Sequence, residues 1–185
     1  MELVVPRTDA ENQFLCNWAA KIIGQDEFKN ARGLGFADHN GIVAVVVLHD
    51  LSPPNVFLSW ASTSPRWFTK RTIFVIYDWI FNQHKCQRVT GLVEKNNKRA
   101  RKIDEGLGMR LEGVLRKASP SGQDLMIYGL LRKEADELIR KLYATHTKNP
   151  KPIQAPSTRP SDASGTSSWR YSIRGRISAH TEGRL

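Results

Sequence analysis

The residues best suited to chemistry lie in a polar turn, residues 62–72, with the sequence STSPRWFTKRT. The turn follows a β-prone run and precedes an apolar helical repeat, so we expect a strand to lead into a helix here. The first backbone N–H groups of such a helix have no partner within it, and together with the helix dipole they attract anions. Lys70, Arg71 and the neighbouring hydroxyls add to that attraction. The turn is therefore predicted to bind phosphate, and the alternative is a capped helix with solvated charges.

A carboxylate and an amide follow the next predicted strand, residues 88–94. Glu94 ends that strand and is a candidate general base, because acylation of an amine requires the amine to lose a proton. Its other interpretation is a surface carboxylate beside Lys95 and Lys98. Asn97 begins the following helical repeat and is expected to cap it, since an Asn side chain accepts from a helical N–H group.

Positive charge is concentrated at the start of this helix, in the run KNNKRARK at residues 95–102. The run is either a solvated helix face, partly paired with Asp104 and Glu105, or a contact for nucleic acid. The whole chain carries a net charge of +10. Such a charge favours an anionic partner, which can be a phosphorylated cofactor, a nucleic acid or an acidic protein.

Nothing in the chain indicates a metal or membrane protein. Cys16 and Cys86 have no Cys or His at ligand spacing, and the five histidines are scattered, so we expect no metal site and a reducing compartment. No apolar run reaches the roughly 18 residues needed to span a membrane. The N-terminus also lacks the pattern of a signal peptide. These features predict a cytoplasmic protein with no membrane partner.

Hydrophobic periodicity predicts strands and helices along the chain. Strands are expected at residues 1–5, 33–37, 41–48, 56–61, 88–94, 110–118 and 125–131. Helices are expected at residues 9–24, 73–81, 97–107 and 133–145. In the first helix Asp9 is the expected cap, and the predicted buried face comprises Phe14, Leu15, Trp18, Ala19 and Ile22.

The end of the chain has a different composition. After Lys148 the sequence is rich in Pro, Ser, Thr and Gly, and it holds six Lys and Arg against Asp162 and Glu182. A segment of this kind buries too little apolar area to offset its loss of conformational entropy. We therefore expect a folded domain at residues 1–147 and a disordered or extended basic tail at residues 148–185.

The stretch Arg88 to Leu131, with Asn97 at a helix start and LGMRLEGVLR after it, resembles the second half of the GNAT superfamily of N-acetyltransferases. It is most similar to the Rim-type ribosomal-protein acetyltransferases. The resemblance implies an α/β fold with a mixed central sheet of six to seven strands flanked by helices. It also implies that the turn at residues 62–72 holds the pyrophosphate of acetyl-CoA, where the family has Arg/Gln-x-x-Gly-x-Gly/Ala. Arg66 matches this pattern, whereas Thr69 and Arg71 fill its glycine positions.

The resemblance assigns further roles by position. Backbone N–H groups near Trp60 are the family's donors to the oxyanion, and Asn97 would contact the pantetheine arm. Asp104 falls where many members have a tyrosine that protonates the leaving thiolate, although Rim-type members also lack it. The residues expected to contact the cofactor are Trp60, Ala61, Ser62, Arg66, Thr69, Lys70, Arg71, Thr72, Asn97 and Arg101.

Three hypotheses about function follow. The first is an acyl-CoA-dependent N-acetyltransferase that uses acetyl-CoA, without a metal, on a primary amine of a protein or small molecule. The second is a catalytically inactive structural or interaction protein that binds a partner through its basic tail. Small phage-encoded members of the superfamily look similar to this chain. The second hypothesis therefore includes a component of a phage virion and a homo-oligomer, located in the virion or in the host cytoplasm. The third is nucleic-acid binding.

Overall fold

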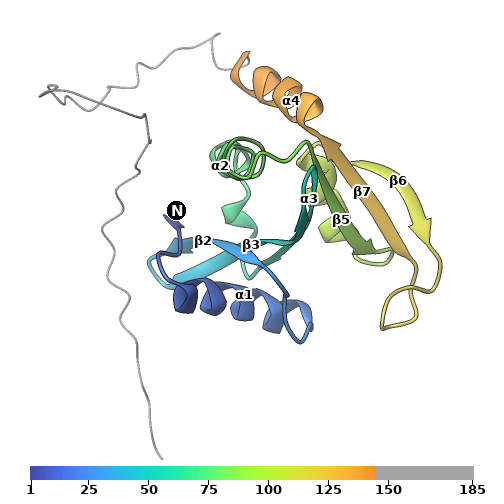
Figure 1. Ribbon diagram of the computed structural model, residues 1–185, viewed down its shortest axis with the longest axis horizontal. Helices are drawn as coiled ribbons and strands as arrows, with labels where there is room; N and C mark the ends of the chain where they lie inside the picture. Colours follow the sequence, from blue (N-terminus) through green and yellow to red (C-terminus); the bar gives the residue numbers. More distant parts are fainter. Residues whose placement is uncertain (145–185) are drawn as a thin grey trace, which may run out of the picture.

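The run IVAVVVLHD forms the centre of the sheet, in strand β3 (Gly41–Ser52). Its β-branched residues pack well on a pleated surface, and residues 43–48 are buried on both faces. The computed structural model describes residues 1–144. Within them the sheet has seven strands in the order β1-β2-β3-β4-β5-β7-β6 (Figure 1). The predicted mixed sheet flanked by helices is confirmed.

The elements alternate along the chain much as the periodicity predicts. The other strands are β1 (Glu2–Val4), β2 (Arg32–Asp38), β4 (Asn55–Ser62), β5 (Arg88–Glu94), β6 (Arg110–Leu115) and β7 (Leu125–Leu131). The helices are α1 (Asp9–Ile23), the 3-10 turn η1 (Pro65–Trp67), α2 (Lys70–Tyr77), the π-helical η2 (Asp78–Gln83), α3 (Lys98–Gly106) and α4 (Arg132–Ala144). The predicted tail and its boundary near residue 148 lie outside the described residues.

The sheet divides at β4 and β5, its one parallel pair within the described residues. These strands pair over only three positions, Asn55 with Arg88, Val56 with Val89 and Phe57 with Thr90. Beyond them β4 continues along β3, and β5 continues along β7. The two halves of the sheet therefore diverge, as Figure 1 shows. In the described part of the chain, main-chain groups of β4 beyond Phe57 that face β5 have no strand partner.

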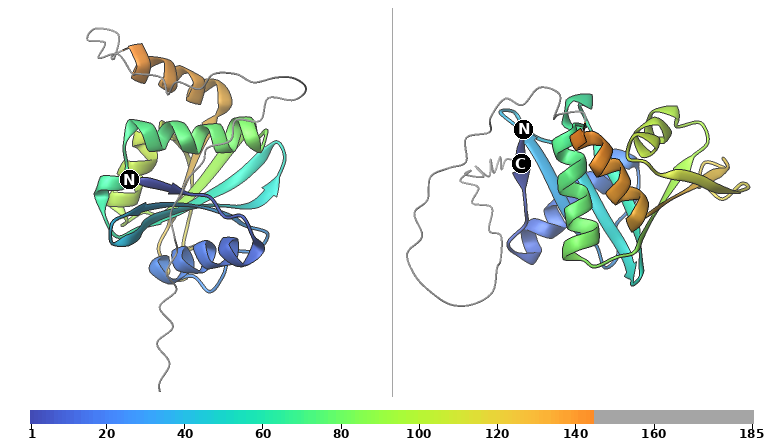
Figure 2. Two further views of the ribbon diagram at one scale, coloured as in Figure 1. Left: turned by 90° about the vertical axis from the view of Figure 1, so that its left-hand side faces the viewer. Right: turned by 90° about the horizontal axis from the view of Figure 1, so that it is seen from above.

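Helices cover the two faces of the sheet with separate cores. α1 lies on one face of β2–β4, and α2 lies on the other, with α4 beyond it (Figure 2). The core under α1 includes Val45, Val47 and Ala61. The larger core, on the opposite face, gathers residues from α2, β5 and β7, and Ile139 of α4 packs against it.

The details predicted for α1 are wrong in two respects. Thr8, not Asp9, is the cap: its hydroxyl accepts from the Glu11 N–H, and the Glu11 carboxylate accepts from the Thr8 N–H. Phe14 and Ile22 are exposed, at 57% and 41%. The helix is turned so that small side chains meet β2. The buried residues of α1 are Leu15, Cys16, Ala19 and Ala20.

The rotation of α1 follows from glycine in β2. A Cβ at Gly33 would lie only 2.8 Å from the Leu15 Cβ, and one at Gly35 would lie 3.0 Å from the Leu15 Cδ2. The absence of these side chains lets Leu15 sit directly on the strand. α1 therefore buries the face that carries Leu15, although hydrophobic spacing alone predicts a buried face that also includes Phe14 and Ile22.

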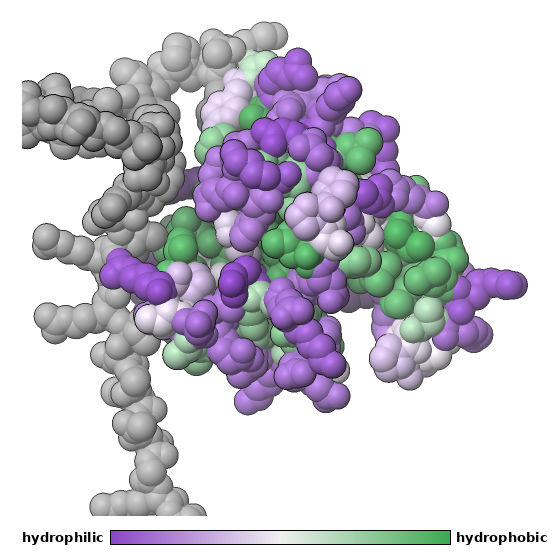
Figure 3. Space-filling model, viewed as in Figure 1, coloured by the Kyte–Doolittle hydropathy of each residue, from purple (hydrophilic) through white to green (hydrophobic). Residues whose placement is uncertain are grey.

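Hydrophobic side chains also remain on the surface near β6 and β7. Figure 3 shows hydrophobic residues gathered over this part of the molecule. Leu111 and Leu115 of the edge strand β6 are 50% and 42% exposed, and Leu131 of β7 is 45% exposed. No helix within the described residues is long and apolar enough to cross a lipid bilayer.

Candidate functional site

The carboxyl group of Asp104 lies in the gap where β4 and β5 diverge. From the β4 side, Trp60 Nε1 donates to Asp104 Oδ1 over 3.0 Å. On the β5 side, a Cβ at Gly91 would lie 3.6 Å from Asp104 Oδ2. Asp104 itself belongs to α3 and is only 2% exposed. One buried carboxyl group therefore reaches both strands at the point where they separate.

The environment of Asp104 favours its protonated form. Burial raises the pKa of this carboxyl group to about 6, and the negative charge of Glu105 acts in the same direction. The hydrogen bond from Trp60 opposes this shift because it favours the carboxylate. A carboxyl group that titrates near neutral pH can donate and recover a proton during a reaction.

Aromatic rings form the wall of the gap next to Trp60. Trp67 is fully buried, with ring centroids 5.8 Å from Trp60 and 5.6 Å from Phe68. Phe68 in turn lies against α3, where a Cβ at Gly106 would be 3.1 Å from its ring. Two buried polar atoms here, Trp67 Nε1 and Ser62 Oγ, have no hydrogen-bond partner within residues 1–144. Buried polar atoms without a partner are uncommon in folded proteins, so both atoms call for an explanation.

The turn that leads to α2 is a capped helix start. Thr69 Oγ1 accepts from the Thr72 N–H over 3.2 Å, and Thr72 Oγ1 accepts from the Thr69 N–H over 2.8 Å. This reciprocal arrangement engages two of the N–H groups that a phosphate would use. The side chains of Arg66, Lys70 and Arg71 are exposed around the same turn. Phosphate binding by the turn therefore stays a prediction that relies on these charges more than on the backbone.

Asn97 and Arg101 both make contacts within the protein. Asn97 Oδ1 accepts from the Ala100 N–H over 3.0 Å, so the predicted cap of α3 is confirmed. Arg101 Nε donates to Tyr128 Oη over 3.1 Å, and its Nη1 donates to the Lys95 carbonyl over 3.3 Å. The first of these bonds ties α3 to β7, and the second ties it to the residue after β5. Contact of either side chain with the cofactor stays a prediction.

Glu94 lies at the end of β5 and is held by the loop between β6 and β7. The hydroxyl groups of Ser119 and Ser121 both donate to its Oε1. These hydrogen bonds lower the pKa of Glu94. A carboxylate with a lowered pKa is a weaker proton acceptor, so the general-base role predicted for Glu94 depends on substrate displacing the two hydroxyls.

Asp104 is the residue whose importance the spacing argument underestimates. It lies four positions after Ala100, on the face of α3 that also carries Ile103 and Leu107 and packs against the core. A carboxylate on the apolar face of a helix is the signal that could have marked it. Within residues 1–144, by contrast, no cluster of His, Cys, Asp and Glu could hold a metal ion, and both cysteines are buried free thiols.

Comparison with known proteins finds structural similarity without a sequence match. No family model and no curated protein sequence matches the chain. A chimeric spermidine N-acetyltransferase from Vibrio cholerae superposes with a TM-score of 0.59 at 15% identity, over 74% of this chain and 99% of that one. A crystal structure of a presumed acetyltransferase from T. thermophilus gives 0.55 at 22% identity, over 68% of this chain and 70% of that one.

A third similar structure belongs to the Rim-type group suggested by the sequence. The ribosomal-protein-S5-alanine acetyltransferase of Vibrio fischeri gives a TM-score of 0.50 at 18% identity, and the alignment covers 55% of this chain and 62% of that one. At these identities the comparisons establish the fold. The diverging β4 and β5, the seven-stranded order and these structural matches agree that the chain has the fold of the GNAT superfamily of acetyltransferases.

Proposed function

We propose that the protein transfers an acyl group, acetyl in the simplest case, from coenzyme A to a primary amine at the gap between β4 and β5. The observation that carries this proposal is the buried Asp104 carboxyl group, which reaches Trp60 of β4 and approaches Gly91 of β5. Transfer of an acyl group from a thioester needs a proton for the leaving sulfur, and Asp104 is placed and tuned to supply it.

The chain's own groups fit the donor in two places. Ser62 Oγ and Trp67 Nε1 are buried hydrogen-bonding atoms without partners in residues 1–144, and they belong to the end of β4 and to η1, which follows it. Arg66, Lys70 and Arg71 surround the start of α2, where negatively charged phosphates would be attracted. When bound, acetyl-CoA supplies an activated thioester carbonyl.

The reaction balances with one proton transfer at each end. The neutral amine nitrogen forms a bond to the carbonyl carbon, and the bond between that carbon and sulfur breaks. N–H groups of β4 near Trp60 that have no strand partner within residues 1–144 would stabilise the negative charge on the carbonyl oxygen. Asp104 gives its proton to the sulfur, the amine loses one proton to water or Glu94, and Asp104 is then reprotonated from solvent.

Two similar structures suggest which amines to test. One of these proteins is named for spermidine and the other for the alanine of a ribosomal protein. Spermidine and alanine both carry a primary amine. Purified protein would be incubated with acetyl-CoA and either spermidine or a peptide that begins with alanine. Thiol release and the mass of the acetylated product would be followed. Asp104→Asn should lower the rate by about 10²–10⁴-fold, the usual contribution of a general acid.

The control for this assay is Glu137→Gln on the exposed surface of α4, which should leave the rate unchanged. Calorimetric titration with acetyl-CoA measures donor binding separately from turnover. Absence of binding at millimolar donor would overturn the proposal. Binding without transfer to any primary amine would overturn its catalytic part.

A further inference from the structure

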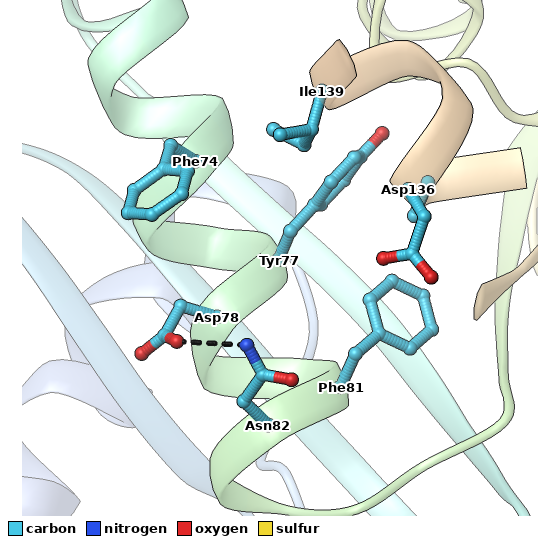
Figure 4. A pocket seen from close by; sticks show the side chains of 8 residues that line it. Phe74, Tyr77, Asp78, Phe81, Asn82, Asp136 and Ile139 are labelled. Atoms are coloured by element: carbon cyan, nitrogen blue, oxygen red, sulfur yellow. Dashed lines mark hydrogen bonds between the residues drawn. The ribbon is translucent and has the colours of Figure 1, made fainter. Parts of the chain in front are cut away.

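A hollow lies between α2–η2 and α4, away from Asp104 (Figure 4). Its volume is about 110 Å³. A single water molecule needs only about 10–15 Å³ on a comparable measure, so the hollow can take the end of a side chain. Phe74 and Phe81 line it from the α2–η2 side, and Asp136 and Ile139 line it from α4. We refer to it as the α2–α4 groove.

The α2–α4 groove combines aromatic rings with a carboxylate that has no partner within residues 1–144. The Asp136 carboxylate makes no hydrogen bond or ion pair within residues 1–144. Arg140, one turn further along α4, donates to the main-chain oxygen of Asp136 instead. Arg132 donates to the Phe81 carbonyl and to Asn82 Oδ1. The two nearest arginines therefore leave the carboxylate of Asp136 available.

A second carboxylate borders the groove at the start of η2. Asp78 accepts from the Asn82 side-chain amide over 3.0 Å and from the Gln83 amide over 2.9 Å. These neutral donors hold the Asp78 side chain in place without cancelling its charge. Two carboxylates beside aromatic rings suit a cation, because the ring faces attract positive charge and the carboxylates accept its N–H groups.

We propose that the α2–α4 groove binds a lysine of the chain's own segment that follows α4, residues 145–151. This segment contains Lys148 and Lys151, and residues 145–185 together hold seven Lys and Arg against two acidic residues. The segment leaves α4 directly after Ala144, and α4 itself forms one wall of the groove. The covalent link makes its local concentration far higher than that of any free basic partner.

The length of the segment permits this return. Asp136 lies eight residues before Ala144 on α4, a distance of about 12 Å at roughly 1.5 Å per residue. Four extended residues from Ala144 to Lys148 span about 13 Å at roughly 3.3 Å per residue. Lys148 is thus the first lysine that can reach Asp136, and Lys151 reaches it with slack. A lysine there would hold the tail against the helix whose first turn carries Lys70 and Arg71.

Carbodiimide cross-linking of the full-length chain tests the proposal, because it joins a carboxylate to an amine only where the two are in contact. After cross-linking at low ionic strength, peptide mapping should find Asp136 or Asp78 joined to Lys148 or Lys151. The link to Asp136 should disappear in Asp136→Asn, and links to either carboxylate should disappear in about 1 M salt, where the Debye length falls to about 3 Å. Glu137→Gln, on the adjacent exposed position of α4, should leave it intact.

A mixture of isotopically heavy and light protein separates the two possible origins of a link. Links within one chain support the proposal, whereas links found only between heavy and light chains would show that a second copy occupies the groove and would overturn it. Cross-links from other carboxylates with none from Asp136 or Asp78 to residues 145–151 would overturn it equally. Circular dichroism of each variant verifies that the fold is retained.

Discussion

Asp104 combines burial with a charge-bearing side chain, and this combination links the stability of the protein to pH. Its folded-state pKa of about 6 is above the ordinary value of 3.8, so folding favours the protonated form. The stabilising contribution of that form is complete below about pH 4 and is lost as pH rises through 6. At higher pH the buried group must carry a charge that its surroundings disfavour.

We predict that Asp104→Asn raises the free energy of unfolding at pH 8 by about 2–3 kcal/mol, since each pKa unit corresponds to about 1.4 kcal/mol. The amide keeps an oxygen that accepts from Trp60 and carries no charge at any pH. The advantage should shrink towards zero at pH 4, where Asp104 is protonated. Urea denaturation at pH 4, 6 and 8 measures the difference, and a gain of equal size at every pH would contradict this explanation.

The same substitution separates stability from activity. Asp104→Asn removes the proton that the proposed reaction needs, so the variant should be more stable and much less active. For the wild type, the protonated fraction of Asp104 falls as pH rises above about 6. This residue therefore limits the rate on the alkaline side, while the need for a neutral amine limits it on the acid side.

At the scale of single elements, backbone N–H groups at the start of α2 stabilise the helix through local hydrogen bonds and are therefore less accessible to a ligand. Thr69 and Thr72 satisfy each other's N–H groups, where the family pattern has a glycine at the position of Thr69. These hydrogen bonds hold the turn in place, but they occupy two N–H groups that would otherwise be able to bind phosphate. The exposed Arg66, Lys70 and Arg71 compensate in charge.

We predict that Thr69→Gly strengthens binding of coenzyme A, because it releases the Thr72 N–H for a phosphate oxygen. A hydrogen bond to a charged group contributes about 1.5–3 kcal/mol, which corresponds to a gain in affinity of about tenfold or more. Replacing the cap by glycine should lower the free energy of unfolding by only a few tenths of a kcal/mol. Calorimetric titration with coenzyme A measures the affinity.

The matched control for Thr69→Gly is Thr8→Gly, which breaks the equivalent capping arrangement of α1. It should change stability to a similar extent and leave the affinity for coenzyme A unaltered. Equal affinities of the wild type and Thr69→Gly would show that phosphates do not bind at the start of α2.

An element is predictable from the sequence when the residues that determine it lie within the element itself. The strands and helices were predictable because their periodic patterns are long, as in β3 and α4. The face of α1 was not, because it is set by Gly33 and Gly35, which lie on another element. The bond between Trp60 and Asp104 joins positions 44 residues apart, and no spacing rule connects them. Strand alternation likewise gives no sign that β4 and β5 stop pairing after three positions.

For the whole molecule, the divergence of the half-sheets provides a test of where the proposed donor binds. We predict that acetyl-CoA slows amide hydrogen exchange in β4 from Leu58 to Ser62 and in the first turn of α2. Part of β4 faces a side without a strand partner, and a bound ligand would cover it. Exchange measured by mass spectrometry with and without acetyl-CoA tests this. Slowing confined to α1 or α4 would place the ligand elsewhere.

The short parallel pairing of β4 and β5 also has a mechanical consequence. Three residue pairs and the bond from Thr90 Oγ1 to Asn55 Oδ1 hold the half-sheets together at one end. The bond from Trp60 to Asp104 joins β4 to α3 beyond the last of these pairs. Few main-chain pairs cross the line between the half-sheets, so we expect a load across the strands to fall on them and on this side-chain bond. The side chain proposed to deliver a proton therefore also bears load between β4 and α3.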